Sequence, residues 1–217
     1  MEDVLALYEQ PAQAGRARLC FDERPCQLLD QAVAALPARP GKPAKEDHEY
    51  VRRGTAVVLL AYDVDTGQRY AQVRARRTKA DYADFIHHVV QTRYADVPRL
   101  ELVQDNLNTH TYGAFYEHLP LAQARALSRR LIFHYTPKHG SWLNMAEIEF
   151  SALARQCVNR RIGTLAELAR QVDAWVAERN TRAVKIHWSF TRDTARDKLQ
   201  RWYEKVNPAN KTDASNN

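Results

Sequence analysis

Three acidic residues stand where carboxylates could carry out chemistry. Asp22 and Asp105 each end a short apolar run, and Glu147 lies on a predicted helix that follows a third run. Three carboxylates at one point repel one another unless a cation lies between them. Their oxygens suit Mg²⁺ or Mn²⁺, and two such ions could activate a nucleophile and stabilise the leaving oxygen in phosphoryl transfer. The residues therefore predict a divalent-metal site, provided that the fold brings them together.

Each of these residues also has an ordinary structural interpretation. Asp22 could begin a turn, and Glu147 could be a solvated residue at the edge of a helix. The spacing does not distinguish Asp22 from Glu23. It also leaves Glu149 as an alternative to Glu147, because side chains two residues apart on a helix project about 200° apart and these two flank the apolar face on opposite sides.

Strands and helices that could position these residues alternate along the chain. Apolar runs bounded by turn residues indicate strands, and apolar residues three and four apart indicate amphipathic helices. The predicted strands are residues 19–23, 55–63, 68–76, 100–105 and 131–135. The predicted helices are residues 1–10, 78–94, 112–130 with a break at Pro120, a helix from Ser141 as N-cap, 165–180 and 191–206. This order predicts an α/β domain with a mixed sheet.

Three segments carry further expectations. The nearly continuous apolar run 55–63 is typical of a central strand that is covered on both faces. Residues 25–49 are predicted to be irregular, and the part rich in Pro and Lys, 37–47, is predicted to be an exposed loop. The polar end of the chain, 207–217, has the composition of a disordered tail.

Composition excludes several classes of protein. The sequence has no run of 18 apolar residues, so no membrane span is expected. Its acidic beginning lacks the basic region of a secretory signal, and its 3 cysteines form no CxxC pair, which argues for a reducing compartment and against a structural zinc site. We therefore expect a cytoplasmic, nucleoid-associated protein.

The basic residues favour a polyanionic partner. The formal net charge is +6, a moderate lean toward nucleic acid. Four clusters stand out: Arg52–Arg53, Arg74–Arg76–Arg77–Lys79, Arg129–Arg130 and Arg155–Arg160–Arg161. Each cluster alone is typical of a solvated surface, but four of them in one small domain make a DNA-binding surface a reasonable hypothesis.

Two sequence blocks resemble a known family. DNLNTH begins at Asp105 and HYTPKHGSWLNMAEIEF contains Glu147, while CFDE around Asp22 matches the first acidic motif. Together they resemble the DDE transposases of the mariner superfamily, specifically the bacterial insertion-sequence branch, over residues 19–203. The separation of Asp105 from Glu147 is longer than is usual in the superfamily, and we place the extra length in the predicted helical segment before the last strand.

The resemblance implies a fold, a cofactor and site residues. The implied fold is a ribonuclease H-like, mixed five-stranded sheet flanked by helices. Asp22, Asp105 and Glu147 become the catalytic triad and the ligands of Mg²⁺ or Mn²⁺, with two ions expected. Further residues are hypothesised to contact DNA, or else to order loops, cap a helix or face solvent: Arg74, Arg76, Arg77, Lys79, Asn106, Asn108, His110, Lys138 and His139.

The resemblance also implies partners and a domain plan. The expected partner is double-stranded DNA, as transposon ends and target, bound by a homodimer. Residues 1–18 form a helical lead-in too short for a helix-turn-helix region. We expect the chain to be either a fragment or one product of a split reading frame whose other product is a separately encoded helix-turn-helix part; 19–206 form the catalytic domain. Two alternatives are a ribonuclease H-like nuclease without strand transfer, and an inactive DNA-binding or assembly module that regulates a full-length transposase.

Overall fold

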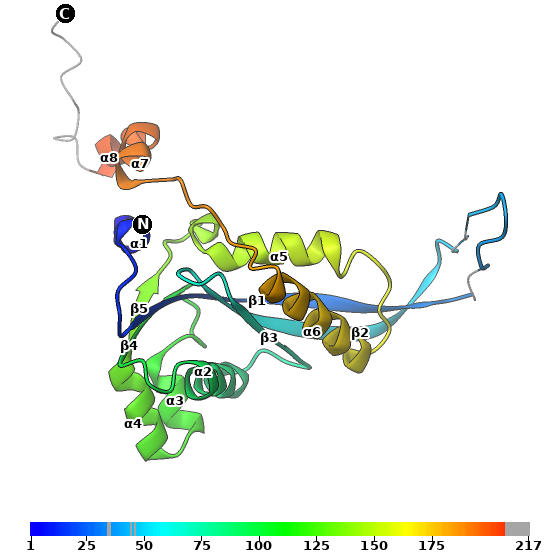
Figure 1. Cartoon of the computed structure of the whole chain (residues 1–217), viewed down its shortest axis with the longest axis horizontal. Helices are drawn as coiled ribbons and strands as arrows, with labels where there is room; N and C mark the ends of the chain where they lie inside the picture. The colour runs from blue at the N-terminus through cyan, green and yellow to red at the C-terminus, as the bar shows by residue number, and fades with distance from the viewer. Residues whose placement is uncertain (34–35, 44, 46, 207–217) are drawn as a thin grey trace, which may run out of the picture.

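A five-stranded sheet forms the centre of the molecule in the computed structural model, which describes residues 1–33, 36–43, 45 and 47–206 (Figure 1). The strand order is β3-β2-β1-β4-β5. The pairs β1–β2 and β2–β3 are antiparallel, whereas β1–β4 and β4–β5 are parallel. The bounds are β1 Arg16–Gln31, β2 Tyr50–Asp63, β3 Arg69–Arg74, β4 Arg99–Gln104 and β5 Leu131–Tyr135. The mixed five-stranded sheet predicted from the sequence is confirmed.

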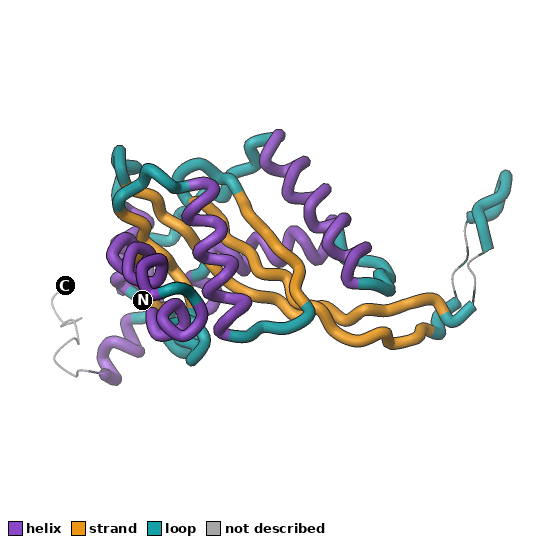
Figure 2. The backbone as a smooth tube through the Cα atoms, turned by 90° about the horizontal axis from the view of Figure 1, so that it is seen from below, coloured by secondary structure: helices purple, strands orange, loops and turns teal. Residues whose placement is uncertain are grey.

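Helices cover both faces of this sheet (Figures 1 and 2). One face packs on α2, α3 and α4, and the other packs on α5 and α6. The helix bounds are α1 Glu2–Glu9, α2 Lys79–Arg93, α3 Tyr112–His118, α4 Leu121–Arg130, α5 Met145–Gln156, α6 Leu165–Thr181, α7 Arg192–Lys198 and α8 Gln200–Val206. Within the described residues none of these helices is long and apolar enough to span a membrane.

Alternate residues of the central strands serve two separate cores. On β2, Val57 and Leu59 pack toward α2 and α3, whereas Val58 and Leu60 pack toward α5 and α6. All four side chains are buried. Successive side chains of a strand point to opposite faces, so a nearly continuous apolar run fills both layers. The prediction that this strand is covered on both faces is confirmed.

The first hairpin is much longer than the sequence suggested. The prediction that residues 25–49 are irregular is wrong for 25–31, because β1 continues to Gln31. The described residues between Gln31 and Tyr50 lie outside both strands, and within the predicted exposed loop, residues 37–43 and 45 are exposed. Figures 1 and 2 show this two-stranded ribbon leaving the body of the molecule as an arm. Pro25, just beyond the predicted strand 19–23, does not interrupt β1. Pairing of β1 with β4 ends at Cys20, so this edge of β1 is unpaired beyond it, and proline is tolerated on such an edge.

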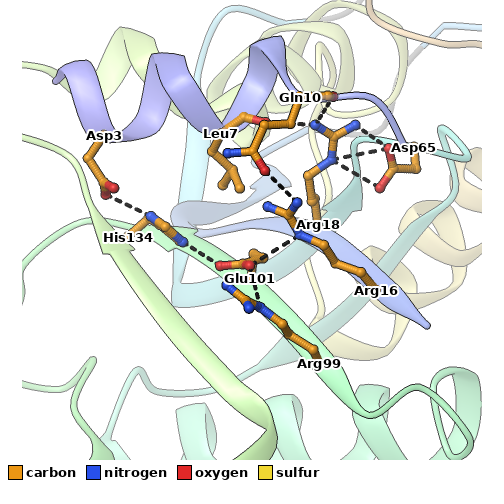
Figure 3. Close-up of polar contacts among 9 residues, drawn as sticks. All are labelled: Asp3, Leu7, Gln10, Arg16, Arg18, Asp65, Arg99, Glu101 and His134. Atoms are coloured by element: carbon orange, nitrogen blue, oxygen red, sulfur yellow. Dashed lines mark hydrogen bonds and ion pairs between the residues drawn. The ribbon is translucent and has the colours of Figure 1, made fainter. Parts of the chain in front are cut away.

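A polar network fastens α1 to the sheet (Figure 3). The buried Glu101 of β4 accepts from Arg99 Nε at 2.7 Å, pairs with Arg16 Nε at 3.1 Å, and contacts His134 Nε2 at 2.6 Å. His134 reaches Asp3 of α1 through its other ring nitrogen at 2.7 Å.

A third arginine of the network, Arg18, completes this attachment (Figure 3). The buried Arg18 donates to the carbonyl oxygens of Leu7 and Gln10 at 2.7 and 2.6 Å and forms an ion pair with Asp65. Arg18 thereby supplies donors to two carbonyls at the end of α1.

The helices follow the predictions with two corrections. The break at Pro120 is confirmed, since it separates α3 from α4. The predicted helix 191–206 is divided at Leu199 into α7 and α8. Ser141 is not the N-cap of the helix predicted to begin there, because Ser141–Leu143 is a 3-10 turn and Asn144 caps α5. The predicted disordered tail, 207–217, lies outside the described residues.

Candidate active site

The topology places Asp22 and Asp105 at the same end of the sheet. β1 and β4 are parallel neighbours, with Cys20 opposite Val103 at the last paired position. Asp22 lies two residues beyond this pair on β1, and Asp105 directly follows the end of β4. Carboxyl ends of parallel strands are where α/β sheets build their sites. Asp22 is 9% exposed, whereas Asp105 is half-buried.

The pKa of Asp22 is affected by the charges of both Glu147 and Asp105, which indicates that the carboxylates of these residues lie near it. Burial raises the pKa of Asp22, and the negative charges of Glu147 and Asp105 raise it further. The N–H of Glu23, which donates to Asp22 at 2.8 Å, and the charge of His110 oppose this shift. The resulting pKa of Asp22 is about 7. Like charges disfavour ionisation of a buried carboxyl group, and this is the repulsion that a bound cation would relieve.

His110 connects Asp105 to a fourth carboxylate. Its fully buried ring lies 2.5 Å from Asp105 through Nδ1 and 3.4 Å from Glu23 through Nε2. Burial alone would lower the pKa of His110, but hydrogen bonds to Asp105 and Glu23 and their charges outweigh it and raise the pKa to about 9. His110 is therefore an imidazolium that holds Asp105 in one orientation. A role for His110 in capping the helix that follows is not observed, because Thr111 is the N-cap residue of α3.

Glu23 and Glu149, the two alternatives left open by the spacing, are occupied elsewhere. The Glu23 carboxylate contacts His110 and lies 3.6 Å from Arg77. Glu149 is completely buried, with its carboxylate 2.7 Å from Arg69 Nε and 3.0 Å from Arg179. These ion pairs join α5 to β3 and α6. Glu147, by contrast, is half-buried and acts electrostatically on Asp22.

Asn144 is the residue that the sequence reasoning overlooked. Its side-chain oxygen accepts the N–H of Ala146 at 3.1 Å, and its amide nitrogen donates to Phe21 O at 2.7 Å and lies 3.4 Å from Asp22 Oδ2. The signal in the sequence was its place in the WLNMAE block, where the N-cap was assigned to Ser141 instead.

The predicted DNA contacts fall into two groups. Asn106, Lys138 and His139 line a groove together with Asp105, and all three are exposed. His139 has a φ of 64°, a strained backbone conformation for a residue other than glycine. Asn108 is exposed but does not line this groove.

The basic cluster after β3 lies beside the site only in part. Arg77 reaches the site through Glu23, and its side chain is 57% exposed. Arg76 is exposed, Arg74 is half-buried and donates to Gln72, and Lys79 pairs with Glu117 at 2.8 Å. Of the four, Arg77 is therefore the one whose side chain contacts a carboxylate next to Asp22, that of Glu23.

The acidic residues are not arranged as a preassembled metal cage. Among the described residues, no three His, Cys, Asp or Glu side chains are grouped closely enough to hold a metal ion. The chemistry of the donors nevertheless fits a hard divalent cation, because carboxylate oxygens are the ligands that such cations prefer, and burial together with the charges of Glu147 and Asp105 raises the pKa of Asp22.

The mixed five-stranded sheet with helices on both faces is the fold expected of a ribonuclease H-like domain. The family model of the DDE superfamily endonucleases matches residues 17–169. The chain belongs to this family. No curated protein sequence matches the chain.

Solved structures of a mariner transposase share the fold. The Mos1 mariner paired-end complex with Mn is 16% identical, with a TM-score of 0.55, and the match covers 97% of this chain and 60% of that one. The Mos1 paired-end complex with the left transposon end and the Mos1 strand transfer complex match with TM-scores of 0.56 and 0.54, also at 16% identity, over 96% and 99% of this chain and 59% and 60% of those. The chain thus spans about 60% of the length of these relatives.

Proposed function

We propose that this chain is the catalytic domain of a transposase that cleaves and joins DNA strands during transposition of an insertion sequence. The observation that carries the proposal is the position of Asp22 and Asp105 at the carboxyl ends of the parallel neighbours β1 and β4, with the charge of Glu147 acting on Asp22. Membership of the DDE endonuclease family and the shared fold with Mos1 complexes support it. The bacterial branch rests on the sequence blocks around Asp105 and Glu147.

Asp22, Asp105 and Glu147 are the residues that would hold Mg²⁺ or Mn²⁺, two ions in all. When bound, these ions supply activation of the attacking oxygen and stabilisation of the leaving oxygen at a phosphodiester. The Mos1 complex with Mn supports a divalent cofactor for this fold. The raised pKa of Asp22 adds a reason within this chain, since neutralisation by a cation would relieve the repulsion that burial and neighbouring charges create.

The residues around the triad would position the carboxylates and the DNA strand and would not take part in the reaction themselves. His110 holds Asp105, and Arg77 neutralises Glu23 at the edge of the site. Asn106, Lys138 and His139 line the groove next to Asp105 and are suited to contact a phosphate backbone. These contacts would place a DNA strand along the groove with one phosphate facing the carboxylates.

The partners proposed for the chain are double-stranded transposon ends and target DNA. The Mos1 structures are described as paired-end and strand transfer complexes, and this supports DNA as the substrate here. A homodimer and a separately encoded helix-turn-helix part complete the proposed assembly. In this proposal the separate part recognises the transposon ends.

A strand-cleavage assay with an oligonucleotide duplex that carries the element's end tests the function. The wild-type chain, supplemented with the recognition part if it is silent alone, is expected to nick the duplex with Mg²⁺ or Mn²⁺ and to join the freed end to target DNA. Asp105→Asn should lower the nicking rate by at least about a thousandfold, because charge stabilisation by bound metal is lost. Asp84→Asn, at an exposed position on α2, is the matched control and should leave the rate unchanged.

The products decide between the possible functions. Joined strands support a transposase, whereas nicking without joining identifies a ribonuclease H-like nuclease. Nicking by Asp105→Asn at the wild-type rate contradicts the assignment of the site.

A further inference from the structure

Asn144 connects the two elements that carry Asp22 and Glu147. Its side chain is 1% exposed, between the end of the 3-10 turn Ser141–Leu143 and the first turn of α5. The amide nitrogen faces two acceptors on β1, Phe21 O at 2.7 Å and Asp22 Oδ2 at 3.4 Å. The amide oxygen faces a donor, the N–H of Ala146 at 3.1 Å. One side chain therefore contacts a strand and a helix at once.

The backbone of Asn144 brings Glu147 into the same arrangement. The carbonyl oxygen of Asn144 accepts the N–H of Glu147 at 3.0 Å, and its own N–H donates to Ser141 O at 2.8 Å. Every hydrogen-bonding group of this buried residue thus has a partner, as buried polar groups require. Asn144 thus hydrogen-bonds both to the backbone of Glu147 and to the backbone of β1 at Phe21.

The contact with Asp22 fixes how that carboxylate is turned. Asp22 Oδ1 accepts the N–H of Glu23 at 2.8 Å, and Oδ2 faces the amide of Asn144. A carboxylate that contacts a donor through each oxygen is oriented as well as placed. Side chains that orient ligands in this way tune a metal site although they do not bind the metal themselves.

A helix cap alone does not account for these contacts. Asn, Asp and Ser are about equally good N-caps, since each supplies an oxygen to the first turn. Only asparagine also carries an NH₂ group that can donate to β1 while its oxygen caps the helix. The other long helix on this face, α6, is capped by the Thr164 hydroxyl and has no such second contact in the cap.

We propose that Asn144 is a positioning residue that sets the separation and orientation of Asp22 relative to Glu147, and so the affinity of the site for divalent metal. This inference rests on the proposed function, because it takes both carboxylates as metal ligands. It adds a specific residue through which α5 and β1 are coupled at the site.

The test measures Mn²⁺ binding by the full chain without DNA, from the electron paramagnetic resonance signal of free Mn²⁺. Asn144→Ser keeps a capping oxygen but loses the amide that reaches Phe21 O, so its Kd for Mn²⁺ should rise about 10- to 100-fold. Its melting temperature should also fall, because a buried acceptor loses its donor, and the control below separates this loss of stability from the loss of affinity. Raising Mn²⁺ should restore DNA nicking by this variant. Asn144→Thr, which also keeps a capping hydroxyl, replaces it if Asn144→Ser does not fold.

Thr164→Ala is the matched control, because it removes the cap of α6. It should lower the melting temperature and leave the Kd for Mn²⁺ within about twofold of wild type. A wild-type Kd in Asn144→Ser, or an equal loss of affinity in Thr164→Ala, overturns the inference and leaves Asn144 as a cap only. A wild-type chain that binds no Mn²⁺ overturns the proposed function, and the inference falls with it.

Discussion

At the scale of single residues, the site is defined by which carboxylates have partners. Glu149 has two arginines and Glu23 has a histidine and an arginine, so their charges are balanced within the fold. Asp22 is buried beside other carboxylates, and its pKa is raised to about 7. A buried acidic group with this surplus of negative charge destabilises the metal-free protein when it is ionised.

Asp22→Asn is therefore expected to stabilise the protein in EDTA. The pKa of Asp22 is higher in the fold than in the unfolded chain, so its ionisation costs stability above the unfolded value, and this cost is fully present at pH 8. Replacing the carboxylate by an amide should raise the free energy of unfolding at pH 8 by about 1–4 kcal/mol. Urea denaturation at pH 8 measures it. Added Mn²⁺ should stabilise the wild type and not the variant; a less stable variant in EDTA contradicts the argument.

At the scale of elements, α5 carries two glutamates with different roles, one at the proposed metal site and one in the packing of the helix. Glu147 faces the acidic end of the sheet, and Glu149 ties the helix to Arg69 of β3 and Arg179 of α6. Helical-wheel reasoning placed both at the edge of the apolar face. It could not show that Glu149 is buried, because its partners lie 80 and 30 residues away along the chain. Such partners are brought together by the sheet and not by local periodicity.

Substitution of each glutamate by glutamine should distinguish the two roles, one by its effect on stability and the other by its effect on cleavage. Glu149→Gln leaves two guanidinium groups without a counter-charge, one of them completely buried, and should lower the free energy of unfolding by roughly 3–5 kcal/mol. Below its melting temperature it should still bind Mn²⁺ and cleave DNA within about tenfold of wild type. Glu147→Gln should do the reverse: near wild-type stability, with cleavage lower by several orders of magnitude. Thermal melts measure the stability of each variant, and the nicking assay measures its cleavage rate. The opposite pattern would make Glu149 the metal ligand and Glu147 the packing residue.

Much of the element plan was predictable from local pattern, and the exceptions have physical causes. The strand 55–63 and the break at Pro120 follow from apolar periodicity and from proline chemistry, and both agree with the structure. The length of β1 did not follow, because strand residues of the arm that are exposed lack the apolar signal, and Pro25 mimics an end. The N-cap at Asn144 was missed because Ser141 is an equally good cap by type.

At the scale of the whole molecule, the net charge of +6 favours DNA. Arginines with no close carboxylate contribute most to such binding, whereas Lys79 and Arg18 are already paired. Phosphate contacts release counterions, so affinity falls with salt in proportion to their number. The surface around the site is thus expected to give binding that depends on ionic strength more than on sequence.

Salt dependence measures this surface. For about five phosphate contacts, log K should fall with log salt at a slope of roughly −4 to −5. Arg76→Ala, at an exposed position next to Arg77, should make the slope shallower by about 1. Arg170→Ala, an exposed arginine of α6 paired with Glu167, is the control and should leave it unchanged. Fluorescence anisotropy with a labelled duplex gives the slopes. An affinity that does not change with salt would contradict the claim that phosphate contacts dominate DNA binding.

The long first strand has a mechanical consequence. β1 is a single strand of 16 residues that is held between β2 and β4 at one end and projects with β2 alone at the other. In engineering terms it is a cantilever, and the bending moment of a cantilever is greatest at its clamp. Pairing with β4 stops at Cys20, but β2 remains paired with β3 as far as Val57, which lies opposite Pro25 of β1. The clamp of the arm is therefore at Pro25, and a force applied to its free end enters the sheet on the same strand that carries Asp22.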